Sequence, residues 1–334
     1  MSKGAQSESR EPAAAGWRSL PSPRSHTLRA CLARLCLTAA SRLSLRGLQG
    51  PWYRLAPLLM LCSKRVRGSL RTNLELCFPE LDPAARRDLA RRSVAQGVAA
   101  MLELGPLWRW DRERVLGLVR EFRGREHWDA ARSAGRGIVM LTPHFGAWEL
   151  TSLFVSAHIP LTALYRPPRV AALDPVYRHA RERFGAKLVP ADASGVRALY
   201  RALRRGEAVG LLPDQDPGHG AGEFVPFFGI PANTSTLTAR LMAHCEATPL
   251  LVWAERLACG QGFRLHFIPL DDPALRCGDL TRATLALNQA IERVVRTCPE
   301  QYLWTYRRFR QRPDGERNPY RHGHAALLAK ARAR

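Results

Sequence analysis

The segment Thr142–Glu149, which reads TPHFGAWE, holds the residues best suited to acid–base chemistry. His144 directly follows an apolar run, and a helix is expected to begin near Ala147. Glu149 would then lie in the first helical turn, where its carboxylate can accept a hydrogen bond from Nδ1 of His144. Such a bond fixes the imidazole tautomer and leaves Nε2 as a general base. The alternative is a histidine satisfied in the core, with Glu149 favoured at a helix N-terminus.

Two other polar segments also follow apolar runs of the strand type. Arg166 comes directly after one run, and its guanidinium suits a phosphate or a carboxylate. Asp214 and Gln215 follow another. In an α/β sheet the carboxyl ends of the strands form the usual site, so these side chains are expected to share a cleft with His144. Each one alone is equally consistent with a solvated or locally paired side chain.

The elements that must position these residues alternate between strand and helix. The expected strands are 137–141, 161–165, 187–189, 208–212, 250–255 and 263–268. The expected helices are 148–156, 175–184, 194–205, 234–246 and 281–297. This alternation predicts an α/β fold, with a mixed, largely parallel sheet flanked by helices. Residues 66–132 are expected to be helical, so an N-terminal helical region precedes the sheet.

Other catalytic systems lack their motifs in this sequence. It contains no G-x-S-x-G nucleophile elbow, no H-E-x-x-H zinc pair and no G-x-x-x-x-G-K-[ST] phosphate loop. None of the eight cysteines forms a C-x-x-C pair. We therefore expect neither a metal ion nor a cofactor.

The charge balance points to a polyanionic partner. The chain carries a net charge of +22, and 47 of its 51 basic residues are arginine. Residues 1–60 and 301–334 each hold nine basic and two acidic residues, which together supply +14 of that charge. Nucleic acid, anionic lipid headgroups and a phosphorylated substrate all fit. A nucleic-acid-binding protein would show aromatic and basic residues interleaved on one face, or a known binding motif. Neither is present, so this class is a remote alternative.

Four regions are expected along the chain. Residues 1–26, rich in serine, proline and arginine, form a disordered leader. Residues 27–65 mix leucines with arginines at helical spacing and form an amphipathic membrane-associating segment, unless this helix packs on the protein's own core. Residues 66–312 form the catalytic domain, and 313–334 a basic tail. The longest charge-free stretches have sixteen residues, short of the roughly eighteen that a membrane span requires.

Six motifs in a fixed order carry a resemblance to a known family. They are Asn73–Glu80 (NLELCFPE), the H-x-x-x-x-E of residues 144–149, the Y-R-P turn at 165–167, L-P-D-Q-D at 212–216, the apolar segment 224–234, and EQYLWTYRRF at 300–309. Together they resemble the late acyltransferases of lipid A biosynthesis, the lauroyl and myristoyl transferase family, which is related to the glycerolipid acyltransferases. The resemblance covers residues 28–312.

The resemblance implies a membrane-associated enzyme at the cytoplasmic face of the inner membrane. Such an enzyme moves a fatty acyl chain from acyl carrier protein to a hydroxyl of a lipid A precursor, a phosphorylated glycolipid. It implies His144 and Glu149 as the catalytic dyad, and Arg166, Asp214 and Gln215 as substrate-binding residues. A general base suffices, because thiolate is a good leaving group. An anionic membrane surface is the second expected partner. Acylation of another membrane lipid, such as a glycerophospholipid or an aminolipid, is the alternative.

Overall fold

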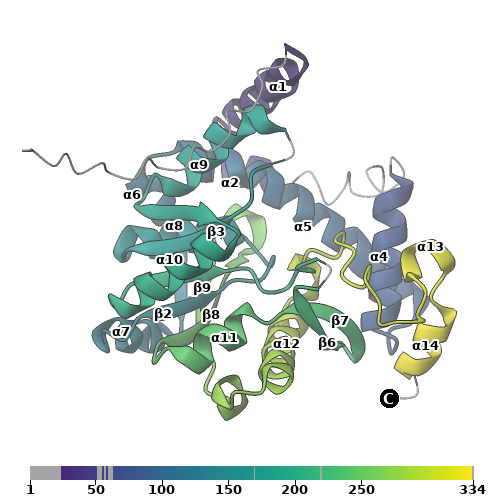
Figure 1. The fold of residues 1–334 in the computed structure, drawn as a ribbon. Coiled ribbons are helices and arrows are strands. Elements are labelled where there is room, and N and C mark those ends of the chain that lie inside the picture. Colours follow the sequence, from purple (N-terminus) through teal and green to yellow (C-terminus); the bar gives the residue numbers. More distant parts are fainter. Residues whose placement is uncertain are drawn as a thin grey trace, which may run out of the picture.

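The computed structural model describes residues 24–50, 55, 58, 63–168, 170–218 and 220–332. A seven-stranded sheet lies at the centre of the molecule (Figure 1). Its strands, in spatial order, are β1 (Val119–Arg123), β9 (Phe263–Pro269), β8 (Thr248–Arg256), β2 (Ile138–Leu141), β5 (Ala208–Leu211), β3 (Leu161–Tyr165) and β4 (Ala186–Pro190). All neighbours are parallel except β8 and β9. The predicted mixed, largely parallel α/β sheet is therefore confirmed.

Helices cover both faces of this sheet. One face holds α6 (Arg112–Leu116), α7 (Arg125–Ser133), α8 (Trp148–His158) and α9 (Asp174–Glu182), and the other holds α10 (Ala193–Arg204), α11 (Leu237–His244) and α12 (Leu280–Thr297). In β2, Ile138 and Met140 pack with α8, whereas Val139 and Leu141 pack with α10 and α12. A strand buried on both sides reads as an unbroken apolar run, which is why the sequence located β2.

The predicted N-terminal helical region consists of α4 (Lys64–Cys77) and the long α5 (Pro83–Arg109), which begins at an Asp82 cap. The C-terminal segment lies beside α4 (Figure 1). It contains α13 (Pro319–His322) and α14 (Ala325–Arg332). The side-chain amide of Asn73 donates to the carbonyls of Trp304 and Tyr306, both at 2.7 Å, and the Tyr320 hydroxyl donates to Asn73. Residues 313–332, expected as a basic tail, are thus tied to α4.

Two sequence expectations about elements were wrong. The helix expected at 234–246 begins later, because Thr234 and Ser235 pair with β6 (Gly222–Phe227) as the end of β7 (Ile230–Ser235). The tight turn of this hairpin places Phe228 and Gly229 at positive φ. Within 66–132, expected to be helical, β1 forms an edge strand. Its five residues include three charged and mostly exposed side chains, so no apolar run marks it.

The N-terminal helices α1 (Arg24–Ser41) and α2 (Leu45–Gln49) pack on α5. At the crossing of α1 with α5, a Cβ on Gly105 would lie only 2.6 Å from the Cβ of Ala40, so glycine is needed for the two backbones to meet. The opposite face of α1 carries Leu28, Leu32 and Leu35, which are 77%, 59% and 65% exposed. Helix α1, in the predicted segment 27–65, therefore packs on α5 through one face and presents leucines on the other.

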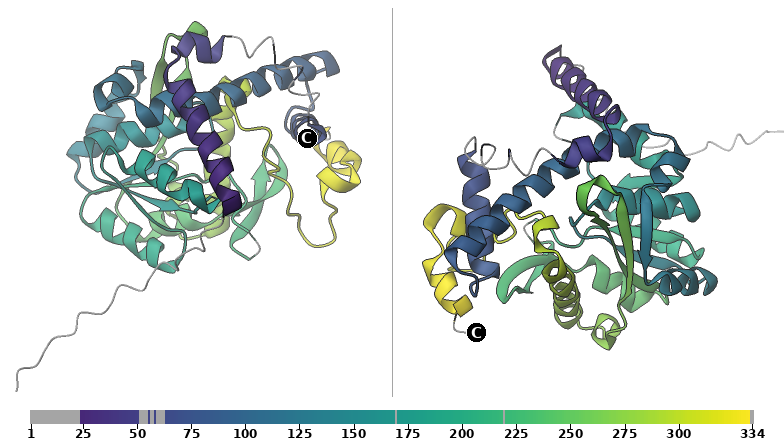
Figure 2. Two further views of the ribbon diagram at one scale, coloured as in Figure 1. Left: turned by 90° about the horizontal axis from the view of Figure 1, so that it is seen from above. Right: turned by 180° about the vertical axis from the view of Figure 1, so that it is seen from behind.

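In Figure 1 and in the right-hand view of Figure 2, α1 projects from the body of the molecule. None of the helices within the described ranges combines the length and the apolar character that crossing a bilayer requires. The predicted leader 1–26 lies outside the described residues except for Arg24–His26, the first residues of α1. Most of 51–62 is also outside them, but Leu55 and Leu58 are described and exposed.

Candidate active site

The register of two parallel strands brings the candidate residues together. Leu141 at the end of β2 is the register partner of Leu211 at the end of β5. His144 lies three residues beyond the first, and Asp214 three residues beyond the second. Because parallel strands leave the sheet at the same edge, these residues lie side by side. The amide of Thr142 donates to the carbonyl of Leu211 at 2.9 Å and continues the pairing past the strand ends.

Asp214 binds His144 through both of its carboxylate oxygens. The backbone amide of His144 donates to Oδ2 at 2.9 Å, and Nδ1 lies 2.9 Å from Oδ1. Burial alone would raise the pKa of the Asp214 carboxyl, which is 2% exposed, but the charge and hydrogen bonds of His144 lower it below its usual value. The imidazole is 16% exposed. Its second nitrogen, Nε2, forms no hydrogen bond with any described residue. Nε2 is therefore available to a substrate.

Tyr302 and Trp148 complete the surroundings of this pair. Burial raises the pKa of Tyr302 far above its usual value, and the negative charge of Asp214 raises it further. The phenol therefore stays protonated beside the carboxylate. The Trp148 ring lies 5.5 Å from the imidazole, centroid to centroid. It forms an aromatic wall beside His144.

The hydrogen bond expected between Glu149 and Nδ1 of His144 is absent, because Asp214 takes that position. Glu149 lies in the first turn of α8, as predicted, but its buried carboxylate pairs with Arg181 of α9. Nε of Arg181 donates to Oε2 at 3.0 Å, and Nη2 donates to Oε1. A bidentate arginine pair is among the strongest partners a carboxylate can find. Glu149 thus joins α8 to α9 next to the His144 turn.

Backbone bonds on every side hold the turn between β2 and α8. Gly146 has φ +59°, and a Cβ there would lie 2.0 Å from the carbonyl oxygen of Ala254, so only glycine fits. Its amide donates to the carbonyl of Gln301 at 3.1 Å, and the amide of Ala147 donates to the carbonyl of Ala254 at 2.8 Å. The carbonyl of His144 accepts from the amide of Leu303 at 3.1 Å. The position of His144 is therefore fixed by its backbone.

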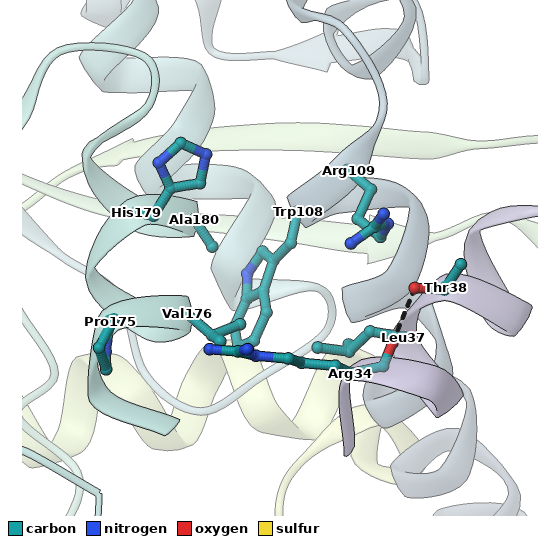
Figure 3. Close-up of a pocket in the computed structure, with 9 residues that line it drawn as sticks. All are labelled: Arg34, Leu37, Thr38, Trp108, Arg109, Pro175, Val176, His179 and Ala180. Atoms are coloured by element: carbon teal, nitrogen blue, oxygen red, sulfur yellow. Dashed lines mark hydrogen bonds between the residues drawn. The ribbon is translucent and has the colours of Figure 1, made fainter. Parts of the chain in front are cut away.

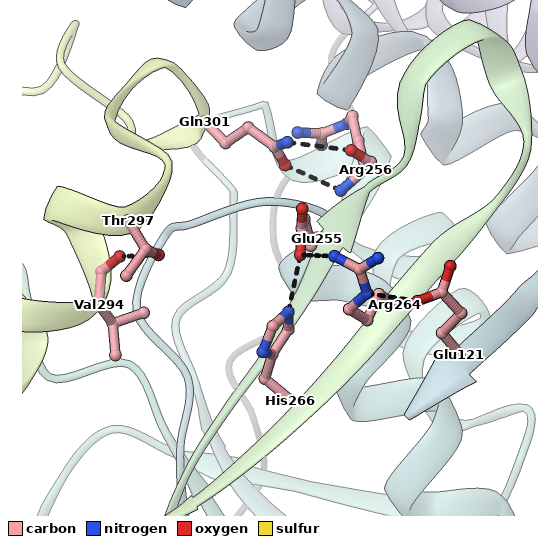
Figure 4. Close-up of polar contacts among 8 residues, drawn as sticks. All are labelled: Glu121, Glu255, Arg256, Arg264, His266, Val294, Thr297 and Gln301. Atoms are coloured by element: carbon pink, nitrogen blue, oxygen red, sulfur yellow. Dashed lines mark hydrogen bonds and ion pairs between the residues drawn. The ribbon is translucent and has the colours of Figure 1, made fainter. Parts of the chain in front are cut away.

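Arg256, at the end of β8, supports this turn from within the core. Its Nη2 donates to the carbonyl of Gly146 at 2.8 Å, and its Nε lies 2.8 Å from both oxygens of Glu103. Both side chains of this pair are almost completely buried. Figure 4 shows the two bonds that join Arg256 to Gln301, at 2.9 and 3.1 Å. Glu103 also accepts from Gln49 of α2 at 2.7 Å, so one network links the N-terminal helices to the turn.

Comparison with known proteins decides the family. Residues 48–311, most of the chain, match the family described as bacterial lipid A biosynthesis acyltransferase. This protein belongs to that family. It is an acyltransferase, and the resemblance seen in the sequence is confirmed.

Three relatives show the extent of the similarity to this acyltransferase. The lipid A biosynthesis palmitoleoyltransferase of Escherichia coli K12 is 30% identical over 258 residues, which cover 77% of this chain and 83% of the relative. The lauroyltransferase of the same strain is 29% identical over 268 residues, or 80% and 86% of the two chains. Its myristoyltransferase is 29% identical over 262 residues, or 77% and 79%.

The remaining predicted site residues of the acyltransferase lie at the same sheet edge. Arg166 follows β3, the neighbour of β5, and its side chain is exposed. Gln215 is half-buried beside Asp214. The next residue, Asp216, accepts from the amide of Gly218 and the side-chain amide of Asn233, both at 2.9 Å, and so anchors this loop. Across the described ranges no three His, Cys, Asp or Glu side chains cluster as a metal site would require.

Sequence reasoning missed Arg181, Arg256 and Tyr302. It also assigned Asp214 to the substrate instead of to His144. One feature of the sequence did point to Asp214, because it follows an apolar strand just as His144 does. A single sequence does not show, however, that these two strands are neighbours in the sheet. Arg256 also ends a strand, and a charged residue there is ordinarily solvated. Only the fold shows that its partner Glu103 is buried.

We predict that Arg256→Met lowers the free energy of unfolding by about 3–5 kcal/mol, because Glu103 is left charged and buried without its partner. Acyl transfer should fall as well, since Gly146 loses its donor. Urea unfolding and an acyl-transfer assay measure the two effects.

The matched control is Arg264→Met on the neighbouring strand β9. Arg264 pairs with Glu121 at 2.6 Å and Glu255 at 3.0 Å (Figure 4), but its side chain is partly exposed. Such a pair contributes only about 0–1 kcal/mol. Equal losses in the two variants would contradict a special role for the buried pair.

Proposed function

We propose that this acyltransferase moves a fatty acyl chain from acyl carrier protein to a hydroxyl of a lipid A precursor, with His144 as the general base. The observation that carries the proposal is the His144–Asp214 contact at the carboxyl end of β2, which leaves Nε2 unbonded. The family supports the acceptor class, and the resemblance in the sequence motifs supports the donor.

The proposed reaction needs one base and no covalent intermediate. The carboxylate of Asp214 accepts a hydrogen bond from Nδ1–H, so the neutral imidazole presents its lone pair at Nε2. Nε2 removes the proton of the acceptor hydroxyl as the oxygen attacks the thioester carbonyl carbon. The carbon–sulfur bond then breaks, and the departing thiolate takes the proton back from the imidazolium. The products are an ester and the free thiol of the carrier.

Asp214 has the features of a residue that orients a base. Its carboxylate is buried and ionised, and it stabilises the imidazolium that forms during attack. We propose Glu149 as a positioning residue that acts through Arg181 and fixes the first turn of α8 beside Trp148. This role differs from the direct contact that the sequence motif predicted.

Arg166 and Gln215 are the proposed contacts of the substrate. The guanidinium of Arg166 is exposed at the sheet edge that holds His144, where it can bind a phosphate of the glycolipid with paired hydrogen bonds. Gln215 lies between Asp214 and Asp216 in a loop that is held on both sides. It can bond neutral sugar or amide groups of the acceptor.

We propose that the enzyme works at the cytoplasmic face of the inner membrane and that α1 contacts the lipid. Leu28, Leu32 and Leu35 form an exposed ridge on the face of α1 that points away from α5. Arg42 and Arg46, both exposed, follow close behind on the chain. Apolar side chains next to arginines suit an anionic bilayer surface.

The proposed function is tested by offering the purified enzyme lauroyl, myristoyl and palmitoleoyl carrier protein with a lipid A precursor. Mass spectrometry of the glycolipid should show the added mass of one acyl chain. Mass spectrometry of lipid A from cells with and without the gene should show the same difference. Acylation of a glycerophospholipid or an aminolipid instead would overturn the proposed acceptor.

His144→Ala is expected to lower the transfer rate by roughly 10²–10⁴-fold, the usual effect of losing a general base. The unfolding midpoint should barely change, because the backbone of the turn is held by bonds that do not involve the imidazole. The acyl-transfer assay and thermal unfolding provide the measurements. A variant that kept more than half of the wild-type rate would rule out the mechanism.

Asp214→Asn should lower turnover by about 10²-fold or more, because an amide donor facing Nδ1 favours the wrong tautomer. Glu149→Gln is its matched comparison, and it should lower the unfolding midpoint more than Asp214→Asn does, because Arg181 loses its charged partner. Glu149→Gln should lower turnover less than Asp214→Asn does. If Glu149→Gln caused the larger loss of turnover at an unchanged midpoint, Glu149 would be the direct partner of His144 during the reaction.

The triple variant Leu28→Ser/Leu32→Ser/Leu35→Ser should bind anionic vesicles at least about tenfold more weakly, because it lacks the three apolar side chains that would be buried in the bilayer. Since apolar contacts are not screened, the difference should persist at high salt. Vesicle sedimentation is the measurement. Met101→Ser/Phe224→Ser, which removes exposed apolar side chains outside α1, is the control. Equal sedimentation of both variants would move the membrane contact away from α1.

A further inference from the structure

A cavity of about 490 Å³ lies between α1, the end of α5 and α9 (Figure 3). It has the size of a ligand site, since such pockets commonly span about 300–1,000 Å³. It is lined by Arg34, Leu37, Thr38, Trp108, Arg109, Pro175, Val176, His179 and Ala180. None of the proposed catalytic or substrate residues is among them.

The lining divides into an apolar floor and a basic rim. Trp108 and Ala180 are buried, and Leu37 and Val176 are half-buried beside them. Arg34, Arg109 and His179 are exposed. In Figure 3 the side chain of Arg34 extends from α1 towards Trp108 and Val176. The cavity therefore offers apolar surface below and positive charge at its mouth.

Among the described residues, no carboxylate balances this charge. Nothing in the described part of the chain forms a hydrogen bond or an ion pair with the side chains of Arg34, Arg109 or His179. The described part of α1 has no acidic residue, and the acids of α5 and α9 are engaged elsewhere. Their partners are Arg91 and Arg92 for Asp88, Arg256 for Glu103, Tyr165 for Asp174 and Arg178 for Glu182. The rim is thus complementary to an anion.

We infer that this cavity binds one anionic phospholipid of the bilayer, with the phosphate between Arg34 and Arg109 and the start of an acyl chain over Trp108. The apolar floor favours an amphiphile over a free anion. Arg34, Leu37 and Thr38 of α1 line the cavity, and the same helix carries the exposed leucine ridge that we propose contacts the bilayer. The site is separate from the acceptor site, because its lining excludes His144 and Arg166.

The floor of this lipid site is linked to the first turn of α8 through side chains of α9. Trp108 contacts Tyr177 edge-on, with ring centroids 4.9 Å apart. The guanidinium of Arg181 lies 5.5 Å from the centre of the Tyr177 ring and holds Glu149. A bound lipid therefore packs against the same helix, α9, that fixes the first turn of α8. Lipid binding and the geometry of the His144 turn therefore both depend on the position of α9.

Isothermal titration calorimetry of the full chain with dihexanoyl phosphatidylglycerol, kept below its micelle concentration, tests this inference. A monomeric lipid has no surface potential, so general attraction of the basic protein to a charged bilayer cannot contribute. We expect saturable binding of one molecule. Dihexanoyl phosphatidylcholine and inorganic phosphate should each bind much more weakly, because one lacks the net charge and the other the apolar chains.

Arg34→Gln/Arg109→Gln should weaken phosphatidylglycerol binding about 30-fold, through the loss of two charge-assisted contacts. The matched control is Arg282→Gln/Arg293→Gln, which removes the same charge from exposed positions on α12, outside the cavity and away from α1. It should bind as the wild type does. Val176→Phe, which fills the cavity without changing the charge, should also weaken binding.

Three results would overturn the inference. They are no binding of the monomeric lipid, equal losses in the two arginine double variants, or phosphate binding as tight as that of the lipid. The last result would identify a simple anion site. None of these measurements involves acyl transfer, so they remain distinct from any failure of the proposed function.

Discussion

The carbonyl oxygen of Gly146 is the point at which the catalytic turn meets the core. It accepts a hydrogen bond from Arg256, whose charge is held in the interior only because Glu103 is buried with it. A buried charge is costly unless it is paired and fully bonded, so this pair constrains everything around it. β8, α5 and the 301–303 segment must all be in place for the turn to close. The geometry of the candidate active site therefore depends on segments from the whole fold.

The sequence predicted those parts of this fold that depend on local pattern. β2 and β5 were found because a strand buried on both faces is continuously apolar, and α8 because its start follows the turn glycine. β1 was missed because an edge strand with exposed charges has no such pattern. The β6–β7 hairpin was missed because its second strand ends in Asn-Thr-Ser, which also resembles a helix start.

At the site, sequence identified His144 and the three strand ends but chose the wrong neighbour. Glu149 is five residues away along the chain, and that proximity suggested a contact. Asp214 is seventy residues away, yet the pairing of Leu141 with Leu211 places it directly against the imidazole. Contacts across a sheet depend on strand order, which one sequence does not encode in any local pattern. The same limit hid Arg256.

The turn that carries His144 can form only late in synthesis, because its hydrogen-bond partners lie far along the chain. His144 and Gly146 leave the ribosome early, but the groups that fix them come from Ala254, Arg256, Gln301 and Leu303. The turn gains the first of these partners after about three-quarters of the chain and the last after about nine-tenths, because long-range contacts form only after both segments exist. A nascent or truncated chain therefore has α1 complete before the His144 turn is fixed.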